Sequence, residues 1–241
     1  MKIRGERECK DCGTRWSYYE TGSVGCPACG SLRSVGLDDR TEHTDLTVEF
    51  DLTAARNAID EVSTDELADR AREHARKYVR RRGFINAGDL RELDDTYLAA
   101  TELLHVADVV GREVRLEERE ELYFLSLLRD ADEGERPPID EVPPTLRDAR
   151  GLAYANAVRE YRRDVRTWAE DRDLTPAERG ALETLGEHVK RIRMLDGDVE
   201  PRTAERLVDA TRDLADGLRG DDLAFARAQD RLEGLEFGET K

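Results

Sequence analysis

The feature that most constrains the fold of this chain is the placement of its four cysteines within residues 9–29. Cys9 and Cys12 form one Cys-x-x-Cys pair, Cys26 and Cys29 form a second, and thirteen residues separate the two pairs. If those residues fold back, the four thiolates can surround one tetrahedral metal ion. Such a site is closed to water and substrate, so the ion stabilises the fold and takes no part in catalysis. We therefore predict one structural Zn²⁺ per chain.

Two other uses of paired cysteines fit the sequence less well. A disulfide framework requires a secretory context, and the opening segment MKIRGEREC has no apolar signal region. A redox Cys-x-x-Cys is expected beside a βαβ pattern and has no need of a second copy. Thiolates require a reducing compartment, and no apolar run approaches the length of a membrane span. We therefore expect a cytoplasmic protein with no membrane partner.

The residues between the two pairs predict a small β ribbon. The segment TRWSYY (14–19) is rich in strand-forming residues, and ETGSVG (20–25) supplies a reversal. Trp16 and Tyr18 share one face of the predicted strand, and with Arg15 on the other face they are candidate partner-binding residues. The aromatic face could instead pack against the rest of the protein, because so small a ribbon buries few aromatic side chains by itself.

Residues 1 to about 45, MKIRGERECKDCGTRWSYYETGSVGCPACGSLRSVGLDDRTEHT, resemble the zinc ribbon of the transcription-factor-B type. The whole chain also looks like a group of halophilic archaeal proteins that contain a zinc ribbon. The resemblance implies that Cys9, Cys12, Cys26 and Cys29 are the zinc ligands and that the ribbon docks on a protein or nucleic-acid partner. The remaining residues do not resemble the cyclin-like repeats of a transcription factor B.

The charge composition predicts adaptation to multimolar salt. The chain has a net charge of -16, and 34 of its 39 basic residues are arginine. At about 1 M salt the Debye length is only about 3 Å, so the net charge indicates solubility in brine and does not identify a partner. Residues 1–36 carry six basic and four acidic side chains. This segment is therefore the part of the chain least repelled by a phosphate backbone or an acidic protein.

Helix signals dominate after residue 50, so the predicted fold is mostly α: a small N-terminal β zinc ribbon followed by a bundle of about six to eight helices. The predicted divisions are a ribbon (1–36), a linker with a short strand at 46–50 (37–50), a helical lobe (51–132), a proline-rich linker (133–144), a second helical lobe (145–234) and a tail (235–241). The two lobes can also pack as one bundle. Helices are predicted over 63–82, 87–111, 116–132 and 145–172, from Thr175, from Pro201, and over 223–232. Capping boxes at Ser63–Glu66 and Thr175–Glu178 mark two of these starts.

The helix over 145–172 carries an apolar seam with alternating spacings of four and three residues, which is typical of a bundle or a coiled coil. Its members are Tyr154, Val158, Tyr161, Val165 and Trp168. A seam of this kind could also join two copies of the chain, so a homo-oligomer formed through residues 154–168 is one expectation.

Two groups of basic residues are candidates for contact with phosphate. Arg76, Lys77, Arg80 and Arg81 lie near the end of the 63–82 helix, and Arg159, Arg163 and Arg166 form a stripe on the 145–172 helix. An alternative interpretation needs no partner. Cations at a helix C-terminus interact favourably with the helix dipole, and arginines in an acid-rich bundle pair with neighbours such as Glu160 and Asp164.

No catalytic motif stands out in the sequence. Glu102 and His105 form a single Glu-x-x-His, whereas di-iron bundles need two copies, and there is no His-Glu-x-x-His, phosphate-binding glycine loop or nucleophile elbow. We expect a zinc-ribbon adaptor that binds a macromolecular partner in transcription, translation or nucleic-acid handling. A protein–protein scaffold without nucleic-acid contact is the alternative, and an enzyme with a site in the bundle is the third hypothesis.

The acid-rich, lysine-poor composition leads to a testable expectation about salt. Because low salt removes the screening between carboxylates, we expect the melting temperature to fall on dialysis from multimolar to dilute salt. Melting followed by circular dichroism at both concentrations measures this. Equal melting temperatures would contradict the expectation of adaptation to high salt.

Overall fold

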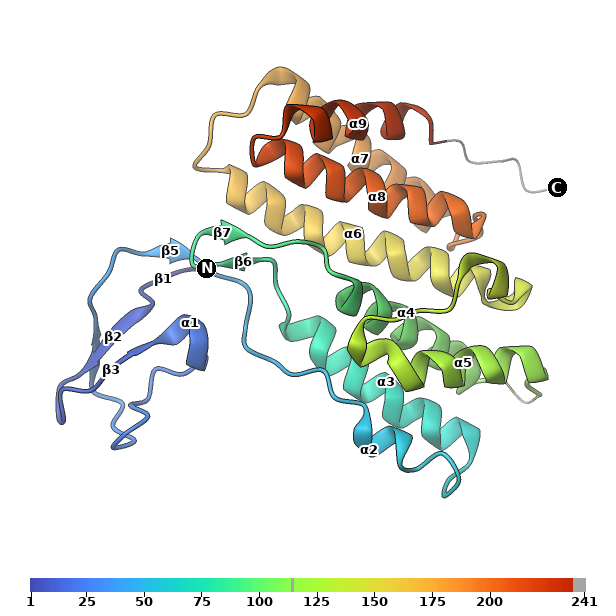
Figure 1. Ribbon diagram of the computed structural model, residues 1–241, viewed down its shortest axis with the longest axis horizontal. Coiled ribbons are helices and arrows are strands. Elements are labelled where there is room, and N and C mark those ends of the chain that lie inside the picture. Colours follow the sequence, from blue (N-terminus) through green and yellow to red (C-terminus); the bar gives the residue numbers. More distant parts are fainter. Residues whose placement is uncertain (114, 236–241) are drawn as a thin grey trace.

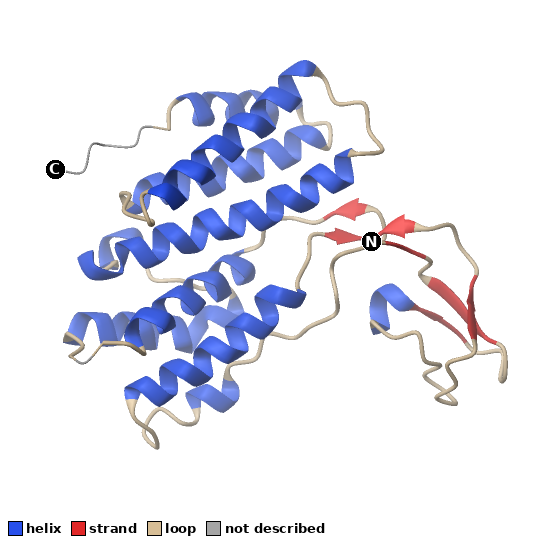
Figure 2. Cartoon of the chain, turned by 180° about the vertical axis from the view of Figure 1, so that it is seen from behind, coloured by secondary structure: helices blue, strands red, loops and turns tan. Residues whose placement is uncertain are grey.

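The computed structural model describes residues 1–113 and 115–235. A small β-containing unit, here called the cysteine module (residues 1–42), lies beside one end of a larger helical body (residues 50–235), as Figures 1 and 2 show from opposite sides. The fold class is therefore mostly α with a small N-terminal β unit, which confirms the prediction.

The cysteine module is built around a three-stranded antiparallel sheet. Its central strand β2 (Glu6–Cys9) pairs with β3 (Arg15–Ser17) on one side and with β4 (Ser34–Gly36) on the other. A separate pair joins β1 (Lys2–Ile3) to β5 (Thr41–Glu42). Strand pairing thus returns residues 41–42 to the beginning of the chain and closes the module.

One continuous apolar core runs through the helical body from Phe50 to Leu235. Helix α6 crosses its middle and packs against α4 on one side and against α7 and α8 on the other (Figure 1). The two predicted helical lobes therefore pack as one bundle. The cysteine module contains the one-turn helix α1 (Tyr18–Thr21). The helices of the body are α2 (Thr53–Arg56), α3 (Thr64–Arg81), α4 (Asp95–Val110), α5 (Glu118–Asp130), α6 (Arg147–Ala169), α7 (Pro176–Met194), α8 (Pro201–Leu218) and α9 (Asp222–Glu233).

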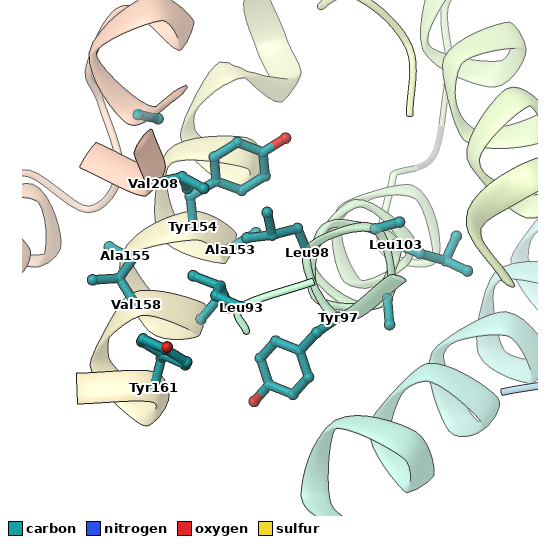
Figure 3. Packing of buried hydrophobic residues seen from close by; sticks show 14 of the residues in the cluster. Leu93, Tyr97, Leu98, Leu103, Ala153, Tyr154, Ala155, Val158, Tyr161 and Val208 are labelled. Carbon is teal, nitrogen blue, oxygen red and sulfur yellow. The ribbon is translucent and has the colours of Figure 1, made fainter. Parts of the chain in front are cut away.

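The apolar seam of α6 lies inside this core. Figure 3 shows Ala153 and Val158 of α6 facing the segment that holds Leu93 and Leu98. All five seam side chains are buried within the chain, with exposed fractions from 0% to 6%: Tyr154, Val158, Tyr161, Val165 and Trp168. Packing within the body leaves none of them free to contact a second copy.

The predicted helix over 87–111 is wrong at its start. Residues 85–90 form a hairpin of strands β6 (Ile85–Asn86) and β7 (Asp89–Leu90), and α4 begins only at Asp95. Ala87 and Gly88 form the hairpin turn with φ of 52° and 88°, which a right-handed helix does not allow. The side chain of Asp94 then caps α4 by accepting the backbone N–H of Tyr97 at 2.7 Å.

Three other local predictions have mixed outcomes. Thr175 and Glu178 form the predicted capping box, but Ser63 makes no capping hydrogen bond and Glu66 pairs instead with Arg70. The described residues 46–50 form no strand, and the backbone N–H of Leu46 donates to the carbonyls of Thr44 and of Arg81 at the end of α3. The proline-rich linker folds into three short 3₁₀ turns, η1 (Ala131–Glu133), η2 (Ile139–Glu141) and η3 (Pro144–Leu146).

A buried polar cluster joins four helices and the proline-rich linker. Arg150 of α6 and Glu102 of α4 are 2% and 0% exposed, and their charged groups lie 3.5 Å apart. The hydroxyls of Tyr123 and Tyr154 donate to the two oxygens of Glu102. Arg150 donates to the Tyr123 oxygen and to the carbonyl of Pro137, both at 3.0 Å, and to Glu205 of α8 at 2.5 Å.

The module is fastened to the body at Thr44, just after β5. The Thr44 hydroxyl donates at 2.6 Å to the carboxylate of Asp164, a residue of α6 that is 3% exposed. The same carboxylate accepts the backbone N–H of Phe84 at 2.8 Å. Arg82 adds ion pairs to Asp45 and Asp94. This anchor fixes the module beside the C-terminal ends of α3 and α6.

Gly151 provides a test of the packing around α6. A Cβ at this position would lie 2.1 Å from the carbonyl oxygen of Gly197, a backbone atom that cannot rotate away. We expect Gly151→Ala to destabilise the fold by about 1–3 kcal/mol, measured by urea unfolding. Gly180→Ala, in α7 with nothing within 4 Å of its Cβ, is the matched control and should stabilise by about 0.5–1 kcal/mol. Equal effects at the two glycines would refute the close contact.

Candidate metal centre and arginine cleft

The four cysteines converge on one point of the module. Cys9 and Cys29 have their sulfurs 3.6 Å apart, Cys12 and Cys26 have theirs 3.5 Å apart, and all four sulfurs lie within 4.8 Å of one another. Four thiolates around a tetrahedral ion with metal–sulfur bonds of about 2.3 Å would be about 3.8 Å apart. The spacing of the sulfurs therefore fits a metal ion held by all four.

The two Cys-x-x-Cys pairs adopt the same turn. The N–H of Cys9 donates to the carbonyl of Thr14 and the N–H of Cys26 donates to that of Ser31, both at 2.9 Å. The glycine after each pair returns a hydrogen bond to the carbonyl of the first cysteine. Gly13 and Gly30 have φ of 74° and 71°, which glycine adopts at least cost. Two equivalent turns thus face each other across the site.

The electrostatics of the quartet also favour a cation. Hydrogen bonding with Thr14 lowers the pKa of the Cys12 thiol to about 6. A backbone hydrogen bond from Ser31 lowers the pKa of Cys29, but the neighbouring thiols of Cys12 and Cys9 outweigh it and raise that pKa to about 12. Four crowded sulfurs cannot all ionise easily unless a positive charge lies among them. A metal ion bound by the four sulfurs would supply that charge.

Trp16 lies neither on an exposed docking face nor against the helical body, the two positions expected from the sequence. It is 7% exposed and packs against Cys9 and Cys26, while its indole N–H donates to the carbonyl of Ser23 at 3.0 Å. The indole thus lies within the module's own small core, neither on a docking face nor against the helical body. Tyr18 is half-buried, with its ring edge toward His43. Arg15 is exposed and pairs with Glu8 at 2.6 Å.

The basic residues of α3 remain exposed and unpaired. Arg76, Lys77, Arg80 and Arg81 line a groove along this helix. In the part of the chain that the structure describes, none of their side chains forms an ion pair or hydrogen bond. The preceding arginine, Arg72, is different, because it pairs with Asp69 and Asp108. The expectation of local ion pairing therefore fails for this group.

The α6 arginines follow the alternative interpretation more closely. Arg159 and Arg163 both pair with Glu160, at 2.7 and 2.6 Å, so two guanidinium groups share one carboxylate. Arg163 also lies 3.7 Å from Asp164. The local pairing that the sequence suggests is thus confirmed for these two arginines. Arg166 is exposed one turn further along α6, near Arg162.

The two basic groups meet in a cavity of about 560 Å³ between the C-terminal end of α3, α4 and α6, here called the arginine cleft. Arg80 of α3 belongs both to this cleft and to the groove along α3. Arg76, Lys77, Arg81 and Arg166 do not line the cleft. Its charged lining consists of five arginines and two carboxylates: Arg80, Arg82, Arg159, Arg163, Arg193, Glu160 and Asp164.

Sequence reasoning missed several residues of the cleft. Arg193 belongs to α7, more than one hundred residues from Arg80, and nothing in the sequence connects the two. Asn156 and His105 lie on the floor of the cleft with their side-chain nitrogens 3.2 Å apart. The two residues of the Glu-x-x-His pair lie in different sites: Glu102 belongs to the buried cluster with Arg150, and His105 lines the cleft. It is an ordinary helix pair and no metal site.

Within the described residues, no helix combines the length and the apolar composition needed to cross a bilayer. No curated protein and no solved structure matches the chain. A family model described as a family of unknown function matches residues 1–232, which include the cysteine module and nearly all of the helical body. The chain therefore belongs to this family of unknown function, DUF7117.

Proposed function

We propose that this protein is a zinc-ribbon adaptor that binds single-stranded nucleic acid through the exposed basic side chains of α3 and the adjoining arginine cleft. The observation that carries the proposal is the set of unpaired cations on α3, Arg76, Lys77, Arg80 and Arg81, in a chain with a net charge of -16. Carboxylates outnumber cations in this chain, so cations without local partners are available to phosphate at the least cost.

The shape of the surface favours a flexible strand. The groove along α3 continues through Arg80 into the arginine cleft, so phosphates of one strand could follow both. A positively charged groove that tracks a backbone is how many proteins hold single-stranded nucleic acid. The resemblance to a transcription-factor-B-type zinc ribbon supports the same class of partner.

Zinc is the ion that best suits the cysteine quartet. Four thiolates favour a soft or borderline ion that accepts tetrahedral geometry, and Zn²⁺ meets both conditions without redox chemistry. In this role the ion holds the two Cys-x-x-Cys turns together, and the module serves as a rigid recognition surface beside the cleft.

A protein partner is the second candidate, and one observation favours it. The cysteine module exposes several large apolar side chains although it has little apolar core of its own. Their exposed fractions range from 37% to 76%: Val24, Leu32, Val35 and Leu37. Exposed apolar side chains grouped on one small module are typical of a docking surface.

The zinc proposal predicts the result of removing one ligand. We expect Cys26→Ser to lose the bound zinc and unfold the module, because so small a unit depends on its metal. The helices should persist, because their core contains no residue of the module. In a Trp168→Phe background, Trp16 is the remaining tryptophan. Its fluorescence emission should shift to the red when Cys26→Ser unfolds the module.

Ala28→Ser introduces the same residue into the same turn without removing a ligand, so it is the matched control. It should keep one zinc per chain in metal analysis and the blue emission of Trp16. Protein that contains no zinc, or a Cys26→Ser variant that retains it, would refute the proposed site.

The nucleic-acid proposal predicts the effect of removing three cations from α3. We expect Arg76→Ala/Lys77→Ala/Arg80→Ala to weaken binding of a fluorescent single-stranded RNA, measured by anisotropy over salt concentrations at which the protein stays folded. Each lost phosphate contact should lower the slope of log affinity against log salt by about 0.7, so the triple variant should lose about 2.

Arg179→Ala/Lys190→Ala/Arg206→Ala is the control, because it removes the same charges from exposed positions on α7 and α8. It should leave the salt slope nearly unchanged. Wild-type protein that shows no affinity for RNA, or equal losses in both triple variants, would contradict the proposal and leave the protein-partner candidate.

A further inference from the structure

The floor of the arginine cleft carries a hydroxyl that the protein leaves unsatisfied. Tyr97 of α4 is 1% exposed, and its ring points from α4 into the space between α3 and α6 (Figure 3). Its hydroxyl forms no hydrogen bond with any residue that the structure describes, and it is not among the fully enclosed unpaired atoms, so it reaches the open space of the cleft. Burial raises the pKa of Tyr97, so the hydroxyl stays protonated and can donate at neutral pH.

A second buried tyrosine, Tyr161, differs from Tyr97 because its hydroxyl is hydrogen-bonded within the protein. Tyr161 of α6 is also 1% exposed, and the rings of Tyr97 and Tyr161 lie on Phe84 at the same centroid distance of 4.8 Å. The Tyr161 hydroxyl donates to the carbonyl of Arg91 at 2.9 Å and lies outside the cleft. The open hydroxyl is therefore a property of the cleft and not of tyrosines packed on Phe84.

Asn156 and His105, which line the same cleft about two turns of α4 further along, add an acceptor. Burial lowers the pKa of His105, so its ring is neutral at neutral pH and can accept the Asn156 amide N–H across the 3.2 Å contact. In that arrangement the amide oxygen of Asn156 has no hydrogen-bond partner among the described residues. The floor thus offers one donor and one acceptor, with Phe84 and Leu104 as apolar walls.

The rim of the cleft has the opposite character, because it is cationic and exposed to solvent. Arg163 is 68% exposed and Arg159 is 46% exposed, and they share the single carboxylate of Glu160. Arg80 and Arg193 form no ion pair with described residues. A guanidinium group with unused N–H donors binds phosphate oxygens strongly.

We propose that the arginine cleft binds one nucleoside monophosphate unit, with its phosphate on the arginine rim and its base against Tyr97 and Asn156. A nucleotide is anionic at one end and carries a flat ring with donors and acceptors at the other, so it matches both halves of the cleft. A cavity of about 560 Å³ is also of the size that small ligands occupy. The inference rests on the proposed function, since the unit is either one residue of a bound strand or a free nucleotide.

Tyr97→Phe tests the inference with a minimal change, and Tyr161→Phe is its matched control. Calorimetric titration with the four 5′-nucleoside monophosphates should give measurable affinity for at least one of them. Tyr97→Phe should weaken that affinity about threefold to tenfold, the effect of one lost hydrogen bond. Tyr161→Phe should leave the affinity unchanged. Tyr97→Phe should melt no lower than wild type, since it removes no hydrogen bond within the protein.

Inorganic phosphate and the free nucleoside separate the two halves of the cleft. Each should bind more weakly than the nucleoside monophosphate, because each meets only the rim or only the floor. If inorganic phosphate binds as tightly as the nucleotide, or if Tyr97→Phe and Tyr161→Phe act alike, the inference is overturned.

A single-stranded RNA distinguishes this inference from the proposed function. RNA binding that depends on Arg76, Lys77 and Arg80 but is unaffected by both Tyr97→Phe and free nucleotide would overturn the nucleotide pocket alone. Nucleotide binding that Tyr97→Phe weakens, in a protein without affinity for RNA, would support the pocket with a free nucleotide as its ligand and overturn the proposed function.

Discussion

The helical body depends on the neutralisation of one charge in its interior. Arg150 can lie among apolar side chains only because Glu102, the Tyr123 hydroxyl, the Pro137 carbonyl and Glu205 surround it. These partners come from α4, α5, α8 and the proline-rich linker. A buried ion without its partner is far more costly than a missing apolar contact. The cluster therefore requires all of these elements to be in register at once, and it gives the linker a fixed course although four prolines prevent it from being helical throughout.

The acid-rich composition sets how arginine is used elsewhere. Many arginines elsewhere in the body pair with nearby carboxylates, as Arg212 of α8, Arg219 just after it and Arg231 of α9 do. Arg76, Lys77, Arg80 and Arg81 of α3 form no ion pair with described residues, and they lie together along one groove. The arginines of the cleft are intermediate between paired and unpaired, because two of them share one carboxylate. In its lining, as along the groove of α3, basic side chains outnumber carboxylates, and here they also meet apolar walls.

Sequence patterns were sufficient to predict a structural element wherever residues close together in the chain determine it. The cysteine spacing predicted the quartet, because each turn is specified by four consecutive residues, and apolar periodicity predicted α6, α7 and α8. The hairpin at 85–90 was missed because a positive φ at Ala87 is not evident from an alanine. Trp16 was misplaced because the cysteines themselves form the surface that covers it. The cleft could not be predicted, because Tyr97, Asn156 and Arg193 meet only after α4, α6 and α7 have packed.

Asp164 contributes both to the anchor of the cysteine module and to the wall of the arginine cleft. Its carboxylate receives Thr44 and so seats the cysteine module, and the same residue is part of the wall of the arginine cleft beside Arg163. A ligand of the cleft that changed the contacts of Asp164 would therefore be thermodynamically linked to the seating of the module. Linkage of this kind is reciprocal: a ligand that binds more tightly when the module is seated must, to the same extent, hold the module in its seat. Through such linkage the cysteine module would respond to a ligand in the cleft, although no residue belongs to both the cysteine quartet and the cleft.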